Sequence, residues 1–253
     1  MIGCIIQARM GSTRLPGKVM KIIDGKNPSL IYTINQLKAC KTLDKIIVAT
    51  TNLHEDDEIV NYLENFDVDV FRGSSDDVLD RYYQCAKHYD FSSIVRITAD
   101  CPLIDPTLVD QGIKLFQSKD YDYVTNTFPR TFPDGNEIEI FSISALENSW
   151  KNAKLPSERE HVTPYFKNNV NLFHIENFSN CKNISHLRWT IDYHEDFELV
   201  KILISKINSR PIYLDKILKI LDSEPELIKI NQNHQPNEGY MKSLEEDKFF
   251  LNK

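Results

Sequence analysis

Apolar positions in roughly the first half of the chain follow two alternating periods. Short runs with strand-like patterning alternate with segments in which apolar side chains recur every three to four residues. The expected strands are residues 2–6, 45–50, 68–71 and 93–98. The expected helices are residues 29–39, 55–65, 76–88 and 106–117, with the third capped near Ser75. Strands that alternate with helices in this way predict an α/β fold with a mainly parallel sheet and helices on both faces.

The pattern becomes less regular after about residue 120. The expected strands there are 123–126, 137–141, 173–176 and 187–191, and the expected helices are 142–150, 158–168 and 195–207. The last segment, 209–253, is polar, and only residues 214–221 form an amphipathic stretch. No internal repeat or low-complexity linker divides the sequence, so we expect a single domain over residues 1–253.

Composition narrows the possible functions. The chain of 253 residues has a formal net charge of −7, which argues against a nucleic-acid-binding protein but permits a basic pocket for a small anion. Its five cysteines lie far apart and include no Cys-x-x-Cys pair, so we expect neither a disulfide framework nor a zinc site. The sequence has no cationic leader and no apolar run near 18 residues long. We therefore expect a soluble, cytoplasmic protein without a membrane partner.

The strongest chemical signal is the run that follows the first expected strand. Gly11 and Gly17 allow backbone N–H groups to approach phosphate oxygens closely, and Arg9, Arg14 and Lys18 supply positive charge. The run is not a Walker P-loop, because five residues separate its glycines and no Ser or Thr follows the lysine. It predicts a polyphosphate-binding loop at the carboxyl end of a parallel strand. The alternative is a surface turn with scattered cations.

Two later strands each lead into an aspartate. The strand at 93–98 is followed by Asp100, and the strand at 187–191 is followed by Asp192. A carboxylate in such a position suits Mg²⁺, which takes one or two protein carboxylates together with phosphate oxygens and water. The alternative for Asp100 is a cap of the next turn. For the acids that follow Asp192, helix capping is a sufficient explanation.

A further polar group surrounds the start of the helix expected at 76–88. It consists of Arg72, Gly73, Ser74, Ser75 and Arg81. Helix N-termini with serine and glycine suit ribose hydroxyls and base edges, and the two arginines add hydrogen-bond donors. An ordinary helix cap is the alternative.

One polar stretch stands out in the second half of the chain. It contains Asn126, Arg130 and Glu137, and Glu137 alternates with Glu139 on one face of the expected strand. The alternative for the two glutamates is a solvated strand face.

Another candidate stretch opens the helix expected at 158–168. Ser157 and Glu160 are spaced as a capping box, and Arg159 and His161 project from the first turns. A lone histidine is more often structural than a ligand, so the pattern alone favours a structural role for His161.

These runs together resemble the cytidylyltransferase family that activates acidic sugars such as Kdo and sialate, and most of all its branch named after the spore-coat polysaccharide protein SpsF. The resemblance implies a Rossmann-like, GT-A-like nucleotidyltransferase fold. It implies a nucleotide-binding half at 1–120, an acceptor-binding half at 121–208 and a C-terminal tail at 209–253. The implied reaction is the Mg²⁺-dependent transfer of CMP from CTP to an acidic acceptor, with release of pyrophosphate. The family's members commonly form homodimers and serve surface polysaccharide or capsule synthesis.

The resemblance also implies roles for individual residues. The expected catalytic residues are Arg9, Arg14, Lys18 and Asp100, and the expected metal ligands are Asp100 and Asp192. The expected nucleotide-binding residues are Gln7, Ala8, Arg9, Met10, Gly11, Ser12, Thr13, Arg14, Lys18, Arg72, Gly73, Ser74, Ser75, Arg81, Thr98 and Asp100. The expected acceptor-binding residues are Asn126, Arg130, Glu137, Arg159 and His161.

The chain departs from the Kdo type next to the expected metal ligand. Cys101 stands where that type has an acidic residue, and Thr98 stands where it has a glutamine. The acceptor therefore stays open between a sugar acid and a phosphate-bearing small molecule. Two rival functions also remain. A nucleotide-sugar glycosyltransferase would place Asp67 and Asp69 at the metal, and a non-catalytic partner would bind CTP without turnover.

Overall fold

The computed structural model describes residues 1–234 and 238–252. A seven-stranded sheet forms its centre, in the order β3-β2-β1-β4-β6-β5-β7. The strands are β1 (Ile2–Gln7), β2 (Lys45–Thr51), β3 (Asp69–Gly73), β4 (Ser93–Thr98), β5 (Tyr123–Thr125), β6 (Glu139–Ser142) and β7 (Ile175–Asn177). Among the strands of the described chain, only β6 runs antiparallel to its neighbours, β4 and β5. The predicted α/β fold with a mixed, mainly parallel sheet is confirmed.

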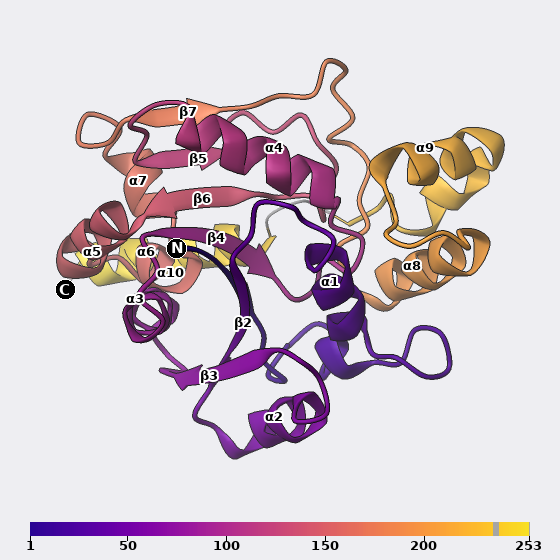
Figure 1. Ribbon diagram of the computed structural model, residues 1–253, viewed down its shortest axis with the longest axis horizontal. Coiled ribbons are helices and arrows are strands. Elements are labelled where there is room, and N and C mark those ends of the chain that lie inside the picture. Colours follow the sequence, from indigo (N-terminus) through magenta and orange to yellow (C-terminus); the bar gives the residue numbers. More distant parts are fainter. Residues whose placement is uncertain (235–237, 253) are drawn as a thin grey trace.

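Helices cover both faces of this sheet (Figure 1). The α-helices are α1 (Ser29–Leu37), α2 (Asp57–Leu63), α3 (Val78–His88), α4 (Pro106–Gln117), α5 (Ile143–Asn152), α6 (Pro156–His161), α7 (Pro164–Asn168), α8 (His194–Lys206), α9 (Leu214–Ser223) and α10 (Glu238–Leu251). Within the described residues, three 3-10 turns accompany them, at Lys18–Met20, His54–Asp56 and Pro225–Ile230. Helices α1, α2 and α4 pack on one face, and α3, α5 and α7 pack on the other.

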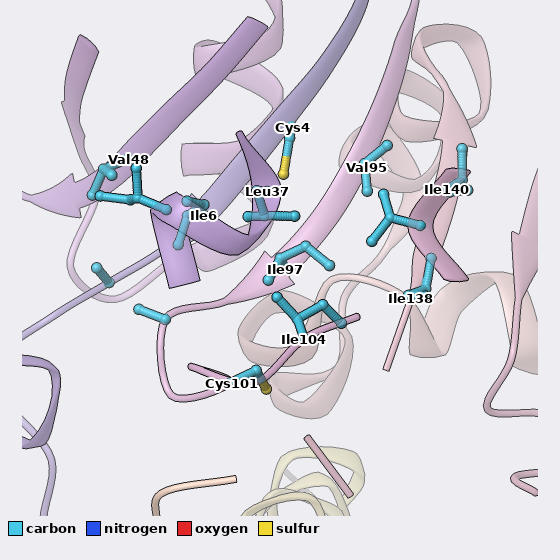
Figure 2. Packing of buried hydrophobic residues seen from close by; sticks show 14 of the residues in the cluster. Cys4, Ile6, Leu37, Val48, Val95, Ile97, Cys101, Ile104, Ile138 and Ile140 are labelled. Atoms are coloured by element: carbon cyan, nitrogen blue, oxygen red, sulfur yellow. The ribbon is translucent and has the colours of Figure 1, made fainter. Parts of the chain in front are cut away.

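The two-sided burial of β1 explains why its sequence is apolar throughout. Cys4 and Ile6 point into the core below α1 and α4, whereas Ile5 points into the core below α3. Figure 2 shows the first of these cores, in which Ile6 lies near Val48 and Leu37. A continuous apolar strand of this kind belongs in the middle of a parallel sheet, and β1 is flanked on both sides, by β2 and β4.

Two expected elements differ in the structure. The helix expected at 158–168 is divided into α6 and α7, because Val162 has a φ of 69° and Pro164 offers no N–H to continue the first helix. The strand expected at 187–191 is not part of the sheet. It is an extended segment with one isolated bridge, from Arg188 to Asp134.

The tail, residues 209–253, has more structure than its polar composition predicted. Its helix α9 packs with α8 around Trp189 in a third apolar cluster, beside the sheet. Helix α10 lies against α6 instead and contributes no residue to the three apolar clusters of the described chain. None of the described helices is long and apolar enough to cross a membrane.

A test of this packing is available at Gly3 in β1. A Cβ atom there would lie 2.1 Å from Cε2 of the buried Phe91 ring, which is closer than real contacts allow. We expect Gly3→Ala to lower the free energy of unfolding by about 1–3 kcal/mol, as overpacking of a close-packed core does. Urea unfolding would measure this. Gly239→Ala, where no atom lies within 4 Å of the added carbon, is the control and should cause no loss.

Candidate active site

A buried carboxylate, that of Asp56, fixes the backbone of the loop that follows β1. Asp56 accepts hydrogen bonds from the backbone N–H of Met10 (2.7 Å) and of Thr51 (3.1 Å), and its own side chain is fully buried. Gly17 closes the loop with a φ of 65° and donates its N–H to the carbonyl of Met10 at 3.1 Å. Such a left-handed residue is strained for any side chain, which explains the glycine.

Lys18 brings the two expected metal ligands together. Its Nζ lies 2.5 Å from Oδ2 of Asp100 and 2.8 Å from Oδ1 of Asp192, although these aspartates are far apart in sequence. Burial opposes the charged forms of both Lys18 and Asp100. The attraction between them outweighs it, so the two carboxylates raise the pKa of Lys18 and the Lys18 ammonium lowers the pKa of Asp100. The two carboxylates therefore converge on one position that already carries a cation.

This donor set fits magnesium. No group of three or more His, Cys, Asp or Glu side chains in the described ranges is arranged to hold a metal ion. Asp100 and Asp192 would thus supply two carboxylate oxygens, and the other positions would be left to water and phosphate. That is the usual manner of Mg²⁺ binding beside a nucleotide.

A second carboxylate positions the first turn of α8 and with it Asp192. Asp196 is fully buried and accepts hydrogen bonds from the backbone N–H of Asp192 and Tyr193, each at 3.0 Å. Arg188 binds both oxygens of Asp196, at 2.9 and 2.8 Å, and its Nη2 lies 3.7 Å from Oδ2 of Asp192. The capping role expected for this acid is confirmed, and it fixes the direction of the Asp192 side chain.

The other two cations of the loop also face acids across the cleft. Arg14 Nη2 lies 2.6 Å from Oδ1 of Asp192, and Arg9 Nη2 lies 3.0 Å from Oε1 of Glu160 in α6. All three cations of the loop therefore point into the same space. This convergence distinguishes the run from a surface turn with scattered charges.

A cleft of about 920 Å³ lies between this loop, the ends of β1 and β4, α6, α10 and the start of α8. Most of the expected nucleotide-binding residues line it: Gln7, Arg9, Gly11, Ser12, Thr13, Arg14, Lys18, Thr98 and Asp100. Ala8 and Met10 are loop residues that do not line it, and neither do Arg72, Gly73, Ser74, Ser75 and Arg81.

The group before α3 has other contacts. Arg72 binds Asp57 (2.5 Å) and the carbonyl of Thr51 (2.9 Å). Arg81 is fully buried and donates from Nη1 to the carbonyl of Ser74 at 2.8 Å. The cap of α3 is Asp77, not Ser75, because the Asp77 carboxylate accepts the N–H of Asp80. These residues therefore shape the turn before α3 without lining the cleft, to which that turn contributes Asp76.

The expected acceptor residues fall into two sets. Arg159 and His161 line the cleft, whereas Asn126, Arg130 and Glu137 do not. The amide of Asn126 is bound to the backbone of residues 136 and 138. Arg159 is bound to Asp77 and to the carbonyl of Trp150.

His161 is held by the tail helix. Its Nε2 lies 3.0 Å from Oγ of Ser243, and burial lowers the pKa of His161 to about 4. It is therefore neutral near pH 7 and cannot bind an acceptor anion as a cation. The capping box expected from Ser157 and Glu160 is also wrong. Glu158 accepts the N–H groups that open α6, and Ser157 binds Asp247.

Glu139 is buried and Glu137 is half-buried, with 23% of its side chain exposed, so neither lies on the freely solvated strand face of the alternative. Only Glu139 belongs to a strand, and its carboxylate binds Arg96 at 2.6 Å, Tyr123 at 2.5 Å and Thr163 at 2.7 Å. These contacts form a closed network beside the cleft.

Glu137 should make stability depend on pH. Burial, with a smaller contribution from Asp134, raises the pKa of Glu137 to about 8. The folded state then binds a proton that the unfolded state has released above about pH 4.3. This contribution is fully present below that value and is lost as the pH rises through 8. We expect Glu137→Gln to unfold with a weaker pH dependence between pH 5 and 8 than the wild type. Equal slopes for the two proteins in urea melts would refute this.

Sequence reasoning missed that the tail reaches the cleft. Glu238, Lys242, Ser243 and Glu246 of α10 line it, together with Tyr193 at the start of α8. The spacing of residues 238, 242 and 246 is a helical period, which is the one signal available. It is indistinguishable from an ordinary solvated helix face without the tertiary contact.

Comparisons with known proteins show similarity over most of the chain. A family model described as cytidylyltransferase matches residues 3–244. The chain is 40% identical to an uncharacterized protein of Methanocaldococcus jannaschii, over 90% of this chain and 93% of that protein. It is 32% identical to the spore coat polysaccharide biosynthesis protein SpsF of Bacillus subtilis, over 88% and 94% of the two chains. A solved cytidylyltransferase from Leptospira borgpetersenii serovar Hardjo-bovis matches with a TM-score of 0.87 at 38% identity, covering 92% of this chain and 98% of that one.

Proposed function

This chain belongs to the cytidylyltransferase family, and we propose that it transfers CMP from CTP to an acidic small-molecule acceptor in a Mg²⁺-dependent reaction that releases pyrophosphate. The observation that carries the proposal is the position of Lys18 between Asp100 and Asp192, directly beside the glycine loop. A triphosphate and its metal ion require cations and carboxylates in the same cleft, and this cleft offers both. The similarity to SpsF supports a role in the synthesis of a surface polysaccharide, such as a capsule.

The loop of residues 8–18 would bind the triphosphate. Arg9, Arg14 and Lys18 each hold a carboxylate across the cleft, and they would exchange these partners for phosphate oxygens. Backbone N–H groups near residues 11–13 add uncharged donors at the same place. Asp100 and Asp192 would hold Mg²⁺, which polarises the α-phosphate when bound.

The chemical step needs positioning and charge neutralisation more than covalent help from the protein. An acceptor oxygen forms a bond to the α-phosphorus while the bond from that phosphorus to the bridging oxygen breaks. The acceptor hydroxyl loses its proton to water, and pyrophosphate leaves with the electron pair of the broken bond. Arg9, Arg14 and Lys18 stabilise the charge that develops on the leaving group.

A specific observation argues against the glycosyltransferase alternative. Asp69 is the first residue of β3, and it is exposed and paired with Lys45 at 2.6 Å. The strands β1, β2 and β3 are parallel, so this end of β3 lies at the opposite edge of the sheet from the cleft. The Asp67-x-Asp69 pair therefore lies far from the converging carboxylates.

Pyrophosphate release tests the proposal. Each of the four ribonucleoside triphosphates would be combined with Mg²⁺ and a panel of sugar acids and phosphorylated metabolites. We expect release with CTP and at least one acceptor. CTP binding without release from any acceptor would favour a non-catalytic nucleotide-binding partner. Failure of CTP to bind at all would refute the proposed donor.

A further inference from the structure

Helix α10 presents one continuous face to the cleft. Glu238, Lys242 and Glu246 are spaced four residues apart and all line the space that also contains Asp100 and Asp192. Residues at this spacing lie one above the other on a helix, so the face extends over two turns. The large apolar side chain of Met241 is 60% exposed and is not among the lining residues.

Polar contacts with α6 hold this face in position, and the two helices lie side by side in Figure 1. The buried Asp247 accepts hydrogen bonds from the N–H (2.9 Å) and the hydroxyl (2.6 Å) of Ser157. Four residues earlier, Ser243 binds His161. Because both contacts are made by buried or half-buried groups, they fix the rotation of α10 and aim its 238/242/246 face at the cleft.

Lys242 differs from most other cations of the cleft. Arg9, Arg14, Lys18 and Arg159 all hold carboxylates, and His161 is neutral. Among the described residues that line the cleft, only Lys154 and Lys242 are cations without a carboxylate oxygen within 4.0 Å. Of these two, Lys242 is flanked on its own helical face by carboxylates, one turn away on each side.

A chain of contacts connects the helical face that carries Lys242 with Asp192. Glu238 accepts a hydrogen bond from the Tyr193 hydroxyl, and its Oε2 lies 3.7 Å from Nη1 of Arg14. Arg14 in turn contacts Asp192. Lys242 lies four residues, or about 6 Å along the axis, beyond Glu238. A small molecule bound to Lys242 could therefore extend toward the metal carboxylates, as an acceptor must.

We propose that Lys242 binds the anionic group of the acceptor while Glu246, and Glu238 on the other side, accept hydrogen bonds from its hydroxyl groups. This inference rests on the proposed function and names the class of acceptor: a polyhydroxylated anion whose charge is a carboxylate or a phosphate. A lysine forms charge-assisted bonds with either group, and carboxylates are acceptors that suit sugar hydroxyls. The C-terminal tail is then part of the acceptor site.

Binding measurements would test this without turnover. The protein would be saturated with Mg²⁺ and the methylene analogue of CTP that cannot be cleaved between the α- and β-phosphates. Ligand-observed NMR would follow titration with Kdo, N-acetylneuraminate and glucuronate as carboxylate probes, glucose 6-phosphate as the phosphate probe and glucose as the neutral control. We expect at least one anionic probe to bind in the millimolar range, and glucose to bind more weakly.

The decisive variant is Lys242→Gln, with Lys248→Gln as its control. Lys248 is exposed on the same helix and does not line the cleft, so its loss is the same change of charge outside the site. We expect Lys242→Gln to weaken the bound probe about tenfold, as the loss of a charge-assisted bond does, and to leave the affinity for the CTP analogue unchanged. The Lys248→Gln protein should match the wild type.

Three outcomes would overturn the inference: no anionic probe binds the wild type, Lys242→Gln binds the probe normally, or Lys242→Gln loses affinity for the CTP analogue instead. Each of these can occur while CTP still binds the wild type, so they leave the proposed donor intact. Failure of the CTP analogue to bind the wild type would count against the proposed function itself.

Discussion

Asp100→Asn and Asp192→Asn are each expected to lower the rate of pyrophosphate release by at least about two orders of magnitude. Each change keeps the shape of the side chain and removes the negative charge that would hold Mg²⁺. It also removes one of the two carboxylates that hold Lys18. Steady-state rates at saturating CTP and Mg²⁺ would measure the effect.

The control for these variants is Asp67→Asn. Asp67 is exposed, belongs to the Asp-x-Asp pair before β3 and is remote from the cleft, so its rate should equal that of the wild type. Thermal melts would show that each variant is folded. A folded Asp100→Asn or Asp192→Asn protein with near-normal turnover would remove that residue from the metal site.

Glu139→Gln is expected to lower the free energy of unfolding by about 3–5 kcal/mol, because it leaves the buried charge of Arg96 without its partner. For a chain of this size, that corresponds to a fall in Tm of about 10 °C. Although burial alone would raise it, Lys167 and Arg96 together lower the pKa of Glu139 to about 2. The stabilising effect is therefore present above about pH 4.3 and is lost as the pH falls toward 2.

Urea unfolding at pH 7 and at several acidic pH values would measure both parts of this expectation. Glu147→Gln is the matched control, since the Glu147 side chain is 42% exposed and, within the described residues, pairs with only the exposed Lys151 and the hydroxyl of Tyr83. A difference between Glu139→Gln and the wild type that stays constant down to acidic pH would contradict the assignment of the effect to this carboxylate.

Local pattern predicted the first half of the chain well. The strand at 93–98 and the helix at 106–117 have the predicted bounds, because each has a clear apolar period and a proline or polar stop at its end. The second half was harder, since its strands are three or four residues long and its helices are short. In such elements, long-range pairing outweighs local propensity.

Glu137 and Glu139 show why local sequence patterns could not predict the burial of individual side chains. Alternation placed Glu137 and Glu139 on one strand face, and the same alternation is typical of a solvated edge. In the structure β6 is an interior strand, between β4 and β5, and Arg96 on β4 lies opposite Glu139. The identity of a neighbouring strand is a property of the sheet order, which no local window contains.

The sequence by itself determined the α/β architecture, and it predicted a phosphate-binding loop after β1 and singled out Asp100 and Asp192, because each of these inferences depends on residues that are close together in the chain. Only the tertiary structure decided that Asp100 and Asp192 meet at Lys18, that Arg72 and Arg81 do not line the cleft, and that α10 forms one of its walls. These facts depend on contacts between segments far apart in sequence. Such contacts are determined by burial and charge pairing in the folded chain. The local sequence of a polar tail does not indicate which surface the tail will cover.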